Sequence, residues 1–322
     1  MKTKKLLSLV LAAVLLLSAC ALTSCSKDEV YEVGVIQLVT HDALDAATEG
    51  FVQALKDKLG EENVNIDVQN AANSTDTCAT IANSFVTKNV DLIMANATPA
   101  LQAAYNATTT IPILGTSVTE YGVALGIENF SGTVGTNVSG TSDLANLDNQ
   151  AQMILDLVPE AKKVGMLYCS SEANSDYQVK KVSEYLKGKG VECTNYAFSD
   201  SNDVGTVAEK AAKECDAIYV PTDNTAASCA ETIYGKTGKT PIIAGEAGIC
   251  AGCGIATLSI SYYDLGYKTG EMAAQILKGE AKVEEMAIAY APQETKKYNA
   301  AICEDLGIDI EALKAAGYEA LS

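Results

Sequence analysis

Short apolar runs alternate with amphipathic segments along most of the chain, and this alternation constrains the fold more than any other feature of the sequence. Residues 32–39 form the first run, and Leu44, Phe51 and Leu55 then recur at helical spacing. Further apolar runs follow at 64–68, 91–95 and 111–114. Short buried strands separated by helices predict a parallel sheet covered by helices on both faces.

The same alternation starts again near residue 150, with apolar runs at 163–168, 191–198, 217–220 and 241–244. We therefore predict an α/β protein with two doubly wound parallel-sheet lobes joined by a hinge. Three extended segments are expected to cross between the lobes, at 133–141, 255–260 and 286–289. This organisation assigns residues 30–138 plus 262–285 to the N-terminal lobe and residues 139–261 plus 286–322 to the C-terminal lobe.

The first 25 residues are typical of an export signal. A basic start is followed by the apolar run 6–19, which is shorter than the roughly 20 residues of a membrane span. Two lipobox-like sequences follow, Leu17-Ser-Ala-Cys20 and Leu22-Thr-Ser-Cys25. We expect residues 1–25 to be a lipoprotein signal peptide and anchor region, with Cys20 lipidated and Cys25 as the alternative. The protein would then be anchored to the outer face of the cell membrane.

The charge balance excludes one class of partner. The chain of 322 residues has 41 acidic residues against 23 basic ones, a formal net charge of −18, and all the basic residues are lysines. An acidic surface without arginine argues against nucleic-acid binding, because phosphates and guanines are read mainly by guanidinium groups.

The cysteines do not predict a metal site. Cys250 and Cys253 have the spacing of a redox pair or half a zinc site, but there is no second such pair and His41 is the only histidine. Free thiols are the preferred interpretation, and a local disulfide stays open. We expect no metal and no cofactor.

Polar residues follow the predicted strands, where the ligands of such sheets bind. Those of the first lobe are mainly hydrogen-bond donors, whereas those of the second lobe include the carboxylates of Glu172, Asp223 and Glu246. This asymmetry predicts a zwitterionic ligand, although several of these residues could instead be helix caps. The expected ligand-binding residues are Thr40, His41, Thr98, Thr116, Ser142, Asp143, Glu172, Asn174, Asp223, Asn224 and Glu246.

Catalytic interpretations find less support. A Ser-His-Asp triad would have to include His41, and the sequence has neither a Gly-x-Ser-x-Gly motif nor a Walker loop. Glu172 and Asp223 could in principle form the carboxylate pair of a glycosidase. A hydrogen-bonding pair at a ligand cleft is the preferred interpretation, so we do not expect an enzyme.

Several ordered motifs carry a family resemblance. The clearest are Asn96-Ala-Thr-Pro-Ala100, Gly140-Thr-Ser-Asp143, Glu172-Ala-Asn-Ser175, Val220-Pro-Thr-Asp-Asn224 and Ala244-Gly-Glu246. With the lipobox and the two lobes, they resemble ABC-transporter substrate-binding lipoproteins of the type I periplasmic-binding-protein-like group, whose best-known members bind tryptophan and other aromatic amino acids. The resemblance implies ligand contacts at Thr98, Ser142 or Asp143, Glu172, Asn174, Asp223, Asn224 and Glu246.

One departure from the family pattern lies near the expected cleft, where Glu120-Tyr121 replaces the usual Asp-Pro. Tyr121 is expected either to cover an aromatic ligand or to lie in a solvent-side loop.

We predict a lipid-anchored receptor that captures a small zwitterion, an aromatic or other apolar amino acid being favoured, and presents it to the permease subunits of an ABC importer. The alternatives are a receptor for a nucleoside or sugar and a ligand sensor for a membrane kinase.

Overall fold

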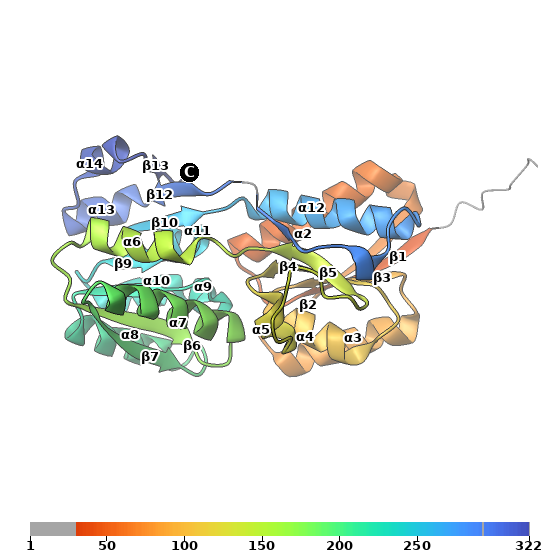
Figure 1. Ribbon diagram of the computed structural model, residues 1–322, viewed down its shortest axis with the longest axis horizontal. Helices are drawn as coiled ribbons and strands as arrows, with labels where there is room; N and C mark the ends of the chain where they lie inside the picture. Colours follow the sequence, from red (N-terminus) through yellow and green to blue (C-terminus); the bar gives the residue numbers. More distant parts are fainter. Residues whose placement is uncertain (1–29, 292, 322) are drawn as a thin grey trace, which may run out of the picture. The chain divides into compact units, whose positions relative to one another are not determined.

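The computed structural model describes residues 30–291 and 293–321, which form two layered α/β lobes (Figure 1). The signal peptide and both candidate lipidation sites, Cys20 and Cys25, lie outside these residues. All described helices and strands belong to one compact unit that begins at Tyr31. Among the described helices, none has the length and hydropathy that crossing a bilayer requires.

The first lobe contains a six-stranded sheet in which every neighbouring pair of strands is parallel. Its strands, in spatial order, are β11 (Ala289–Tyr290), β5 (Val138–Ser142), β4 (Ile113–Val118), β3 (Leu92–Asn96), β1 (Tyr31–Gln37) and β2 (Val64–Asn70). The central strand β3 is buried along its whole length, as the continuous apolar run predicts for a sheet covered on both faces.

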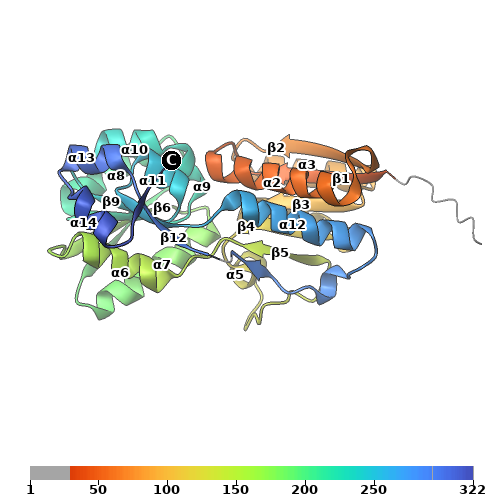
Figure 2. The same ribbon diagram turned by 90° about the horizontal axis from the view of Figure 1, so that it is seen from above.

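Two groups of helices cover this sheet. Helices α3 (Thr75–Lys88), α4 (Thr98–Ala107) and α5 (Tyr121–Leu125) share one hydrophobic core with it. Helices α2 (Asp42–Leu59) and α12 (Tyr262–Leu277) share another core with the opposite face and lie side by side (Figure 2). Their backbones meet at glycines: a Cβ atom on Gly266 would lie 1.9 Å from the carbonyl oxygen of Ala47.

The second lobe contains a seven-stranded sheet, in which only β10 and β12 pair antiparallel. Its strands, in spatial order, are β13 (Glu319–Ala320), β12 (Thr295–Tyr298), β10 (Ala256–Ser259), β9 (Ile242–Ala244), β8 (Ala217–Val220), β6 (Lys163–Cys169) and β7 (Glu192–Phe198).

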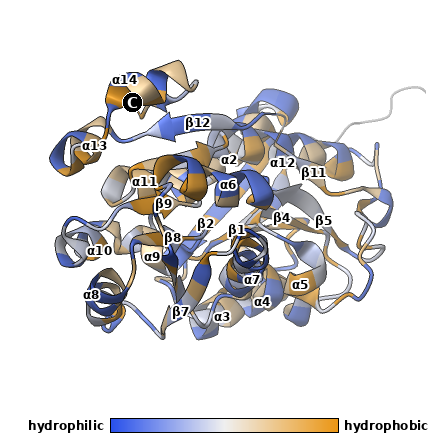
Figure 3. Cartoon of the chain, turned by 60° about the vertical axis from the view of Figure 1, so that its left-hand side comes forward, coloured by the Kyte–Doolittle hydropathy of each residue, from blue (hydrophilic) through white to orange (hydrophobic). Residues whose placement is uncertain are grey.

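Helices on the two faces of this second sheet pack into separate hydrophobic cores. One core includes α6 (Leu147–Leu157), α7 (Ala173–Gly188), α13 (Ala300–Leu306) and α14 (Ile310–Ala315). The other includes α8 (Val204–Glu214), α9 (Asn224–Ser228), α10 (Ala230–Thr237) and α11 (Ala247–Gly252). Polar and apolar residues alternate around outer helices such as α8 (Figure 3), as expected when one side of a helix is buried.

The predicted fold class is confirmed, and the differences lie at the crossovers. Residues 138–142 pair with β4 in the first sheet, although the predicted boundary assigns 139–142 to the second lobe. Residues 289–290 likewise return to the first sheet as β11. An extended segment has the same sequence pattern whichever sheet it joins. The sequence therefore does not show in which lobe a crossover segment pairs. The two short helices α9 and α10 are separated at Cys229.

Tyr121 lies in neither of its two expected positions. Its side chain is fully buried in the first core, and its hydroxyl donates a hydrogen bond to the carbonyl oxygen of Thr141 at 3.0 Å. Gly115 and Gly140 make room for it, because a Cβ atom on either would lie 2.5 Å from the tyrosine oxygen. Tyr121 is therefore a core residue.

Candidate functional site

A buried polar cavity lies where the carboxyl ends of strands from both sheets meet. Its volume is ≈ 10 Å³. The cavity is therefore closed tightly around room for about one water. Its lining residues are His41, Leu44, Ser117, Thr119, Asp143, Asn174, Thr222, Asp223, Asn224, Ala227, Glu246 and Tyr262.

Four buried polar atoms of this lining have no hydrogen-bond partner among the described residues: His41 Nδ1, Ser117 Oγ, Asp143 Oδ1 and Asn174 Oδ1. Burying a polar atom without a partner costs about 1–3 kcal/mol, so several in one cavity indicate that a ligand or water completes them. Ser117 also has a left-handed backbone with φ of 53°, which a serine adopts at some cost in energy.

Asp143 has one carboxylate oxygen fixed and the other free. Oδ2 accepts a hydrogen bond from the Tyr262 hydroxyl at 3.0 Å, whereas Oδ1 is unpartnered among the described residues. Burial raises the pKa of the Asp143 carboxyl to about 6, and the nearby hydroxyl groups of Thr119 and Tyr262 partly oppose this rise. Asp143 therefore offers a strong acceptor to a cationic group.

Glu172, in contrast, has no acceptor capacity left over. Its Oε2 accepts from the backbone N–H and the side-chain amide of Asn224, at 3.0 and 2.7 Å. Its Oε1 accepts from the backbone N–H and the hydroxyl of Thr225, at 2.9 and 2.8 Å. The side-chain amide of Asn174 adds a longer contact to Oε2, at 3.2 Å. Glu172 thus holds the first two residues of α9 in place and is not itself among the residues that line the cavity.

Asp223 and Glu246 both cap helices and both line the cavity, so Asp223 has at once the two roles that the sequence left as alternatives. Asp223 accepts from Ala226 N–H at 2.8 Å and Cys169 N–H at 2.7 Å. Glu246 accepts from the first N–H groups of α11, at 2.6 and 2.7 Å. Burial raises the pKa of both carboxyls, and the neighbouring Glu172 raises that of Asp223 further.

The cavity and its surroundings are strongly acidic. The side chains of Asp143, Glu172, Asp223 and Glu246 are all at most 4% exposed. No lysine is among the described residues that line the cavity, the chain has no arginine, and His41 is the only basic residue there. Buried carboxylates without a base are costly, so this arrangement favours a ligand that carries a positive charge.

The structure brings six of the eleven expected residues to the cavity: His41, Asp143, Asn174, Asp223, Asn224 and Glu246. Thr116 and Ser142 are instead bonded within the first lobe, to Thr141 Oγ1 and to the carbonyl oxygen of Thr119. Thr98 is buried at the start of α4, and Thr40 lies in a more open hollow outside.

The lining also contains residues that are absent from the predicted set, above all Ser117 and Tyr262. Ser117 stands at a predicted strand end, but strand periodicity does not show which hydroxyl there turns inward. Tyr262 is 119 residues from the Asp143 that it contacts, so no local pattern connects the two.

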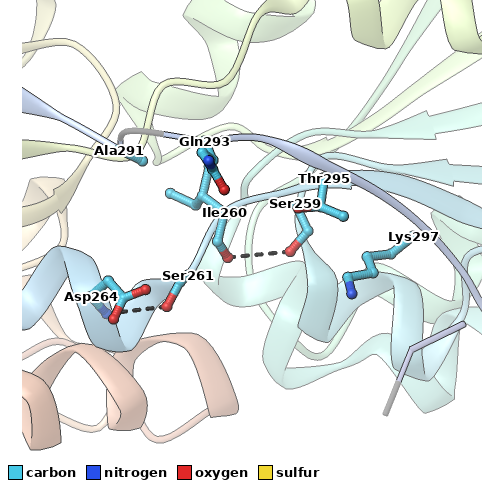
Figure 4. Close-up of a pocket in the computed structure, with 8 residues that line it drawn as sticks. All are labelled: Ser259, Ile260, Ser261, Asp264, Ala291, Gln293, Thr295 and Lys297. Atoms are coloured by element: carbon cyan, nitrogen blue, oxygen red, sulfur yellow. Dashed lines mark hydrogen bonds between the residues drawn. The ribbon is translucent and has the colours of Figure 1, made fainter. Parts of the chain in front are cut away.

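A second hollow, of ≈ 330 Å³, opens beside the crossovers (Figure 4). Its lining is half-buried or exposed apart from Ser259, and the side chains of Ser259, Ser261 and Lys297 have partners within the chain. Ser261 Oγ accepts from Asp264 N–H at 3.2 Å, and Lys297 pairs with Glu319 at 2.7 Å. It has none of the unpartnered buried atoms that mark the interlobe cavity.

The sequence profile of the family described as ABC transporter substrate binding protein matches residues 32–318. The chain belongs to this family. It is 39% identical over 299 residues to a tyrosine-binding protein of Clostridioides difficile, covering 87% of this chain and 86% of the relative. Family membership confirms the predicted resemblance and the expectation of a binding protein rather than an enzyme.

Two solved structures give the fold comparison. A Streptococcus pneumoniae domain in complex with L-Trp is 30% identical, with a TM-score of 0.85. The ligand-free, open structure of a Clostridium difficile substrate-binding protein with adhesive properties is 38% identical, with a TM-score of 0.68. Each comparison covers 91% of this chain and 100% of the other. The backbone of this ABC substrate-binding protein is thus more similar to the ligand complex than to the open structure, although its sequence identity to the open structure is higher.

Proposed function

We propose that this protein captures an α-amino acid, an aromatic one being favoured, in the cavity between its lobes. The observation that carries the proposal is the pair of unpartnered acceptors, Asp143 Oδ1 and Asn174 Oδ1, in a buried cavity without lysine or arginine among its described lining. An ammonium group supplies the three donors and the positive charge that such a cavity needs.

The ligand's carboxylate would require hydrogen-bond donors, since no guanidinium group exists in the chain. Ser117 supplies one, because its buried hydroxyl has no partner among the described residues. Its strained backbone supports a role in binding, since strain of this kind persists where a site needs it.

The preference for an aromatic side chain is supported by the relatives, one named for tyrosine and one solved with L-Trp. The apolar part of the lining, Leu44, Ala227 and the ring of Tyr262, offers such a side chain a surface. The present cavity is smaller than an amino acid, so the lobes must separate for one to enter and must lie farther apart around it than they do here. A ligand bound by both lobes then stabilises the closed state.

Anchoring and transport complete the proposal. Lipidation at Cys20, with Cys25 as the alternative, would hold the protein at the outer face of the cell membrane, where the closed form engages the permease subunits of an ABC importer. A ligand sensor for a membrane kinase remains the alternative outcome. Permease and ATPase genes beside this one would favour transport.

Thermal unfolding of the chain from Ser26 onward tests the ligand class, with the twenty amino acids, several nucleosides and several sugars added in turn. A ligand at 100 times its dissociation constant stabilises the folded state by about 2.7 kcal/mol, which shifts the melting temperature by several degrees. Shifts confined to amino acids support the proposal. Shifts only with nucleosides or sugars would replace the ligand while retaining the receptor.

Asp143→Asn provides the matched variant. It keeps the shape and the Tyr262 contact of the side chain but removes the charge that faces the cavity. The stabilisation by an amino acid should fall in this variant, and an unchanged shift would contradict the assignment of the ammonium to Asp143.

A further inference from the structure

Two side-chain hydrogen bonds join the lobes beside the cavity. His41 Nε2, after β1, lies 3.3 Å from Oδ1 of Asn224, and Asn73 Nδ2, after β2, donates to Oγ1 of Thr225 at 3.0 Å. Asn224 and Thr225 are the first two residues of α9 in the second lobe. Both are held by Glu172.

The carboxylate of Glu172 fixes the direction of these two bonds. An ionised carboxylate only accepts, so Asn224 must turn its Nδ2 toward Glu172 and its Oδ1 toward His41. Thr225 must likewise give its hydroxyl proton to Glu172, which leaves its oxygen to accept from Asn73. Glu172 therefore makes the start of α9 an acceptor surface for donors of the first lobe.

This acceptor surface does not depend on the first lobe. Glu172, Asn224 and Thr225 all belong to the second lobe, and their hydrogen bonds have lengths of 2.7–3.0 Å. The buried carboxylate accepts four charge-assisted hydrogen bonds from its own lobe, so none of these bonds requires the first lobe. The first lobe closes onto a surface that is already formed.

We propose that Glu172 is a positioning residue of a closing latch, made of Glu172, Asn224 and Thr225 in one lobe and His41 and Asn73 in the other. The latch stabilises the closed form through contacts within the protein, and Glu172 does not touch the ligand. This inference rests on the proposed function for its ligand measurements, whereas its measurement on the ligand-free protein is independent of it.

The first test changes the latch outside the cavity. Asn73 has a left-handed backbone with φ of 62°, so Asn73→Gly removes the side-chain bond without backbone strain. Asn89→Gly is the matched control, because Asn89 also has a left-handed backbone, at φ 51°, and its side chain donates to the carbonyl oxygen of Thr87, two residues away in the same lobe. Loss of one hydrogen bond should raise the dissociation rate of the bound amino acid about five-fold, and the control should leave it unchanged.

The second test separates latching from ligand contact. Glu172→Gln keeps the shape but puts an amide N–H₂ against donors, which removes the fixed direction of both bonds. We expect dissociation between about five- and thirty-fold faster. The preference for the amino acid over its deaminated analogue should stay as in the wild type, whereas Asp143→Asn should reduce it. A reduced preference in Glu172→Gln would overturn the inference, because Glu172 would then contact the ammonium group.

The radius of gyration of the ligand-free protein, from small-angle X-ray scattering, gives the independent measurement. Asn73→Gly and Glu172→Gln should be more expanded than the wild type and the Asn89→Gly control. Equal radii together with equal dissociation rates would refute the latch. If no amino acid stabilises the wild type, the proposed function fails, and the scattering comparison alone then decides whether the latch exists.

Discussion

Replacing Asp143 by asparagine should make the ligand-free protein more stable and the ligand complex weaker. Burial raises the pKa of this carboxyl from 3.8 to about 6. A rise of about two pKa units means that keeping the group ionised at pH 7 costs the folded state up to about 3 kcal/mol. Asparagine keeps a partner for Tyr262 but carries no charge, so this cost disappears in the variant.

The pH dependence gives the sign of the effect. Because the folded pKa lies above the ordinary one, the folded state holds the proton more tightly. The unfolding free energy should therefore fall as the pH rises between about 4 and 6 and stay level above that window, as far as Asp143 determines it. In Asp143→Asn this fall in unfolding free energy should be absent. The unfolding free energies of the variant and the wild type should therefore differ more at pH 7 than at pH 4.

Urea unfolding at several pH values from 4 to 8 measures this difference, and titration calorimetry at pH 7 measures the affinity of the amino acid found by thermal unfolding. We expect a gain of up to about 3 kcal/mol in unfolding free energy and a loss of about 1–3 kcal/mol in binding free energy. A variant that is less stable at pH 7 and binds unchanged would refute the reasoning, because Asp143 would then serve the fold rather than the ligand.

Three further experiments test other parts of the structure. Ser117→Gly relieves the left-handed backbone but removes the inward hydroxyl, so the melting temperature should hold or rise while calorimetry shows weaker binding. Gly266→Ala places a methyl group against the backbone of α2 and should lower the unfolding free energy in urea by about 1–3 kcal/mol, more than the exposed Gly188→Ala. Under native conditions, a thiol reagent should modify Cys229 long before Cys250 and Cys253, which are fully buried with pKa values raised by burial; equal rates would contradict the structure.

Much of the fold could be predicted because it depends on local sequence. The apolar run at 91–95 became the fully buried β3, and the helical spacing that begins after His41 became α2. The sequence also predicted that polar residues after the strands would lie close together, because the carboxyl ends of parallel strands lie on the same edge of a sheet. Six of the expected residues meet in the cavity for this reason.

The tertiary structure alone decided what each of those residues does. Glu172 has the sequence context of a ligand contact, yet all its acceptor positions are taken by Asn224 and Thr225, more than 50 residues away. Asp143 keeps one oxygen free because Tyr262, the first residue of α12, holds only the other. Sequence patterns indicate the secondary structure of a short segment and which of its side chains are buried. Whether a buried oxygen is already satisfied depends on donors from remote segments, and only the folded chain brings these within 3 Å.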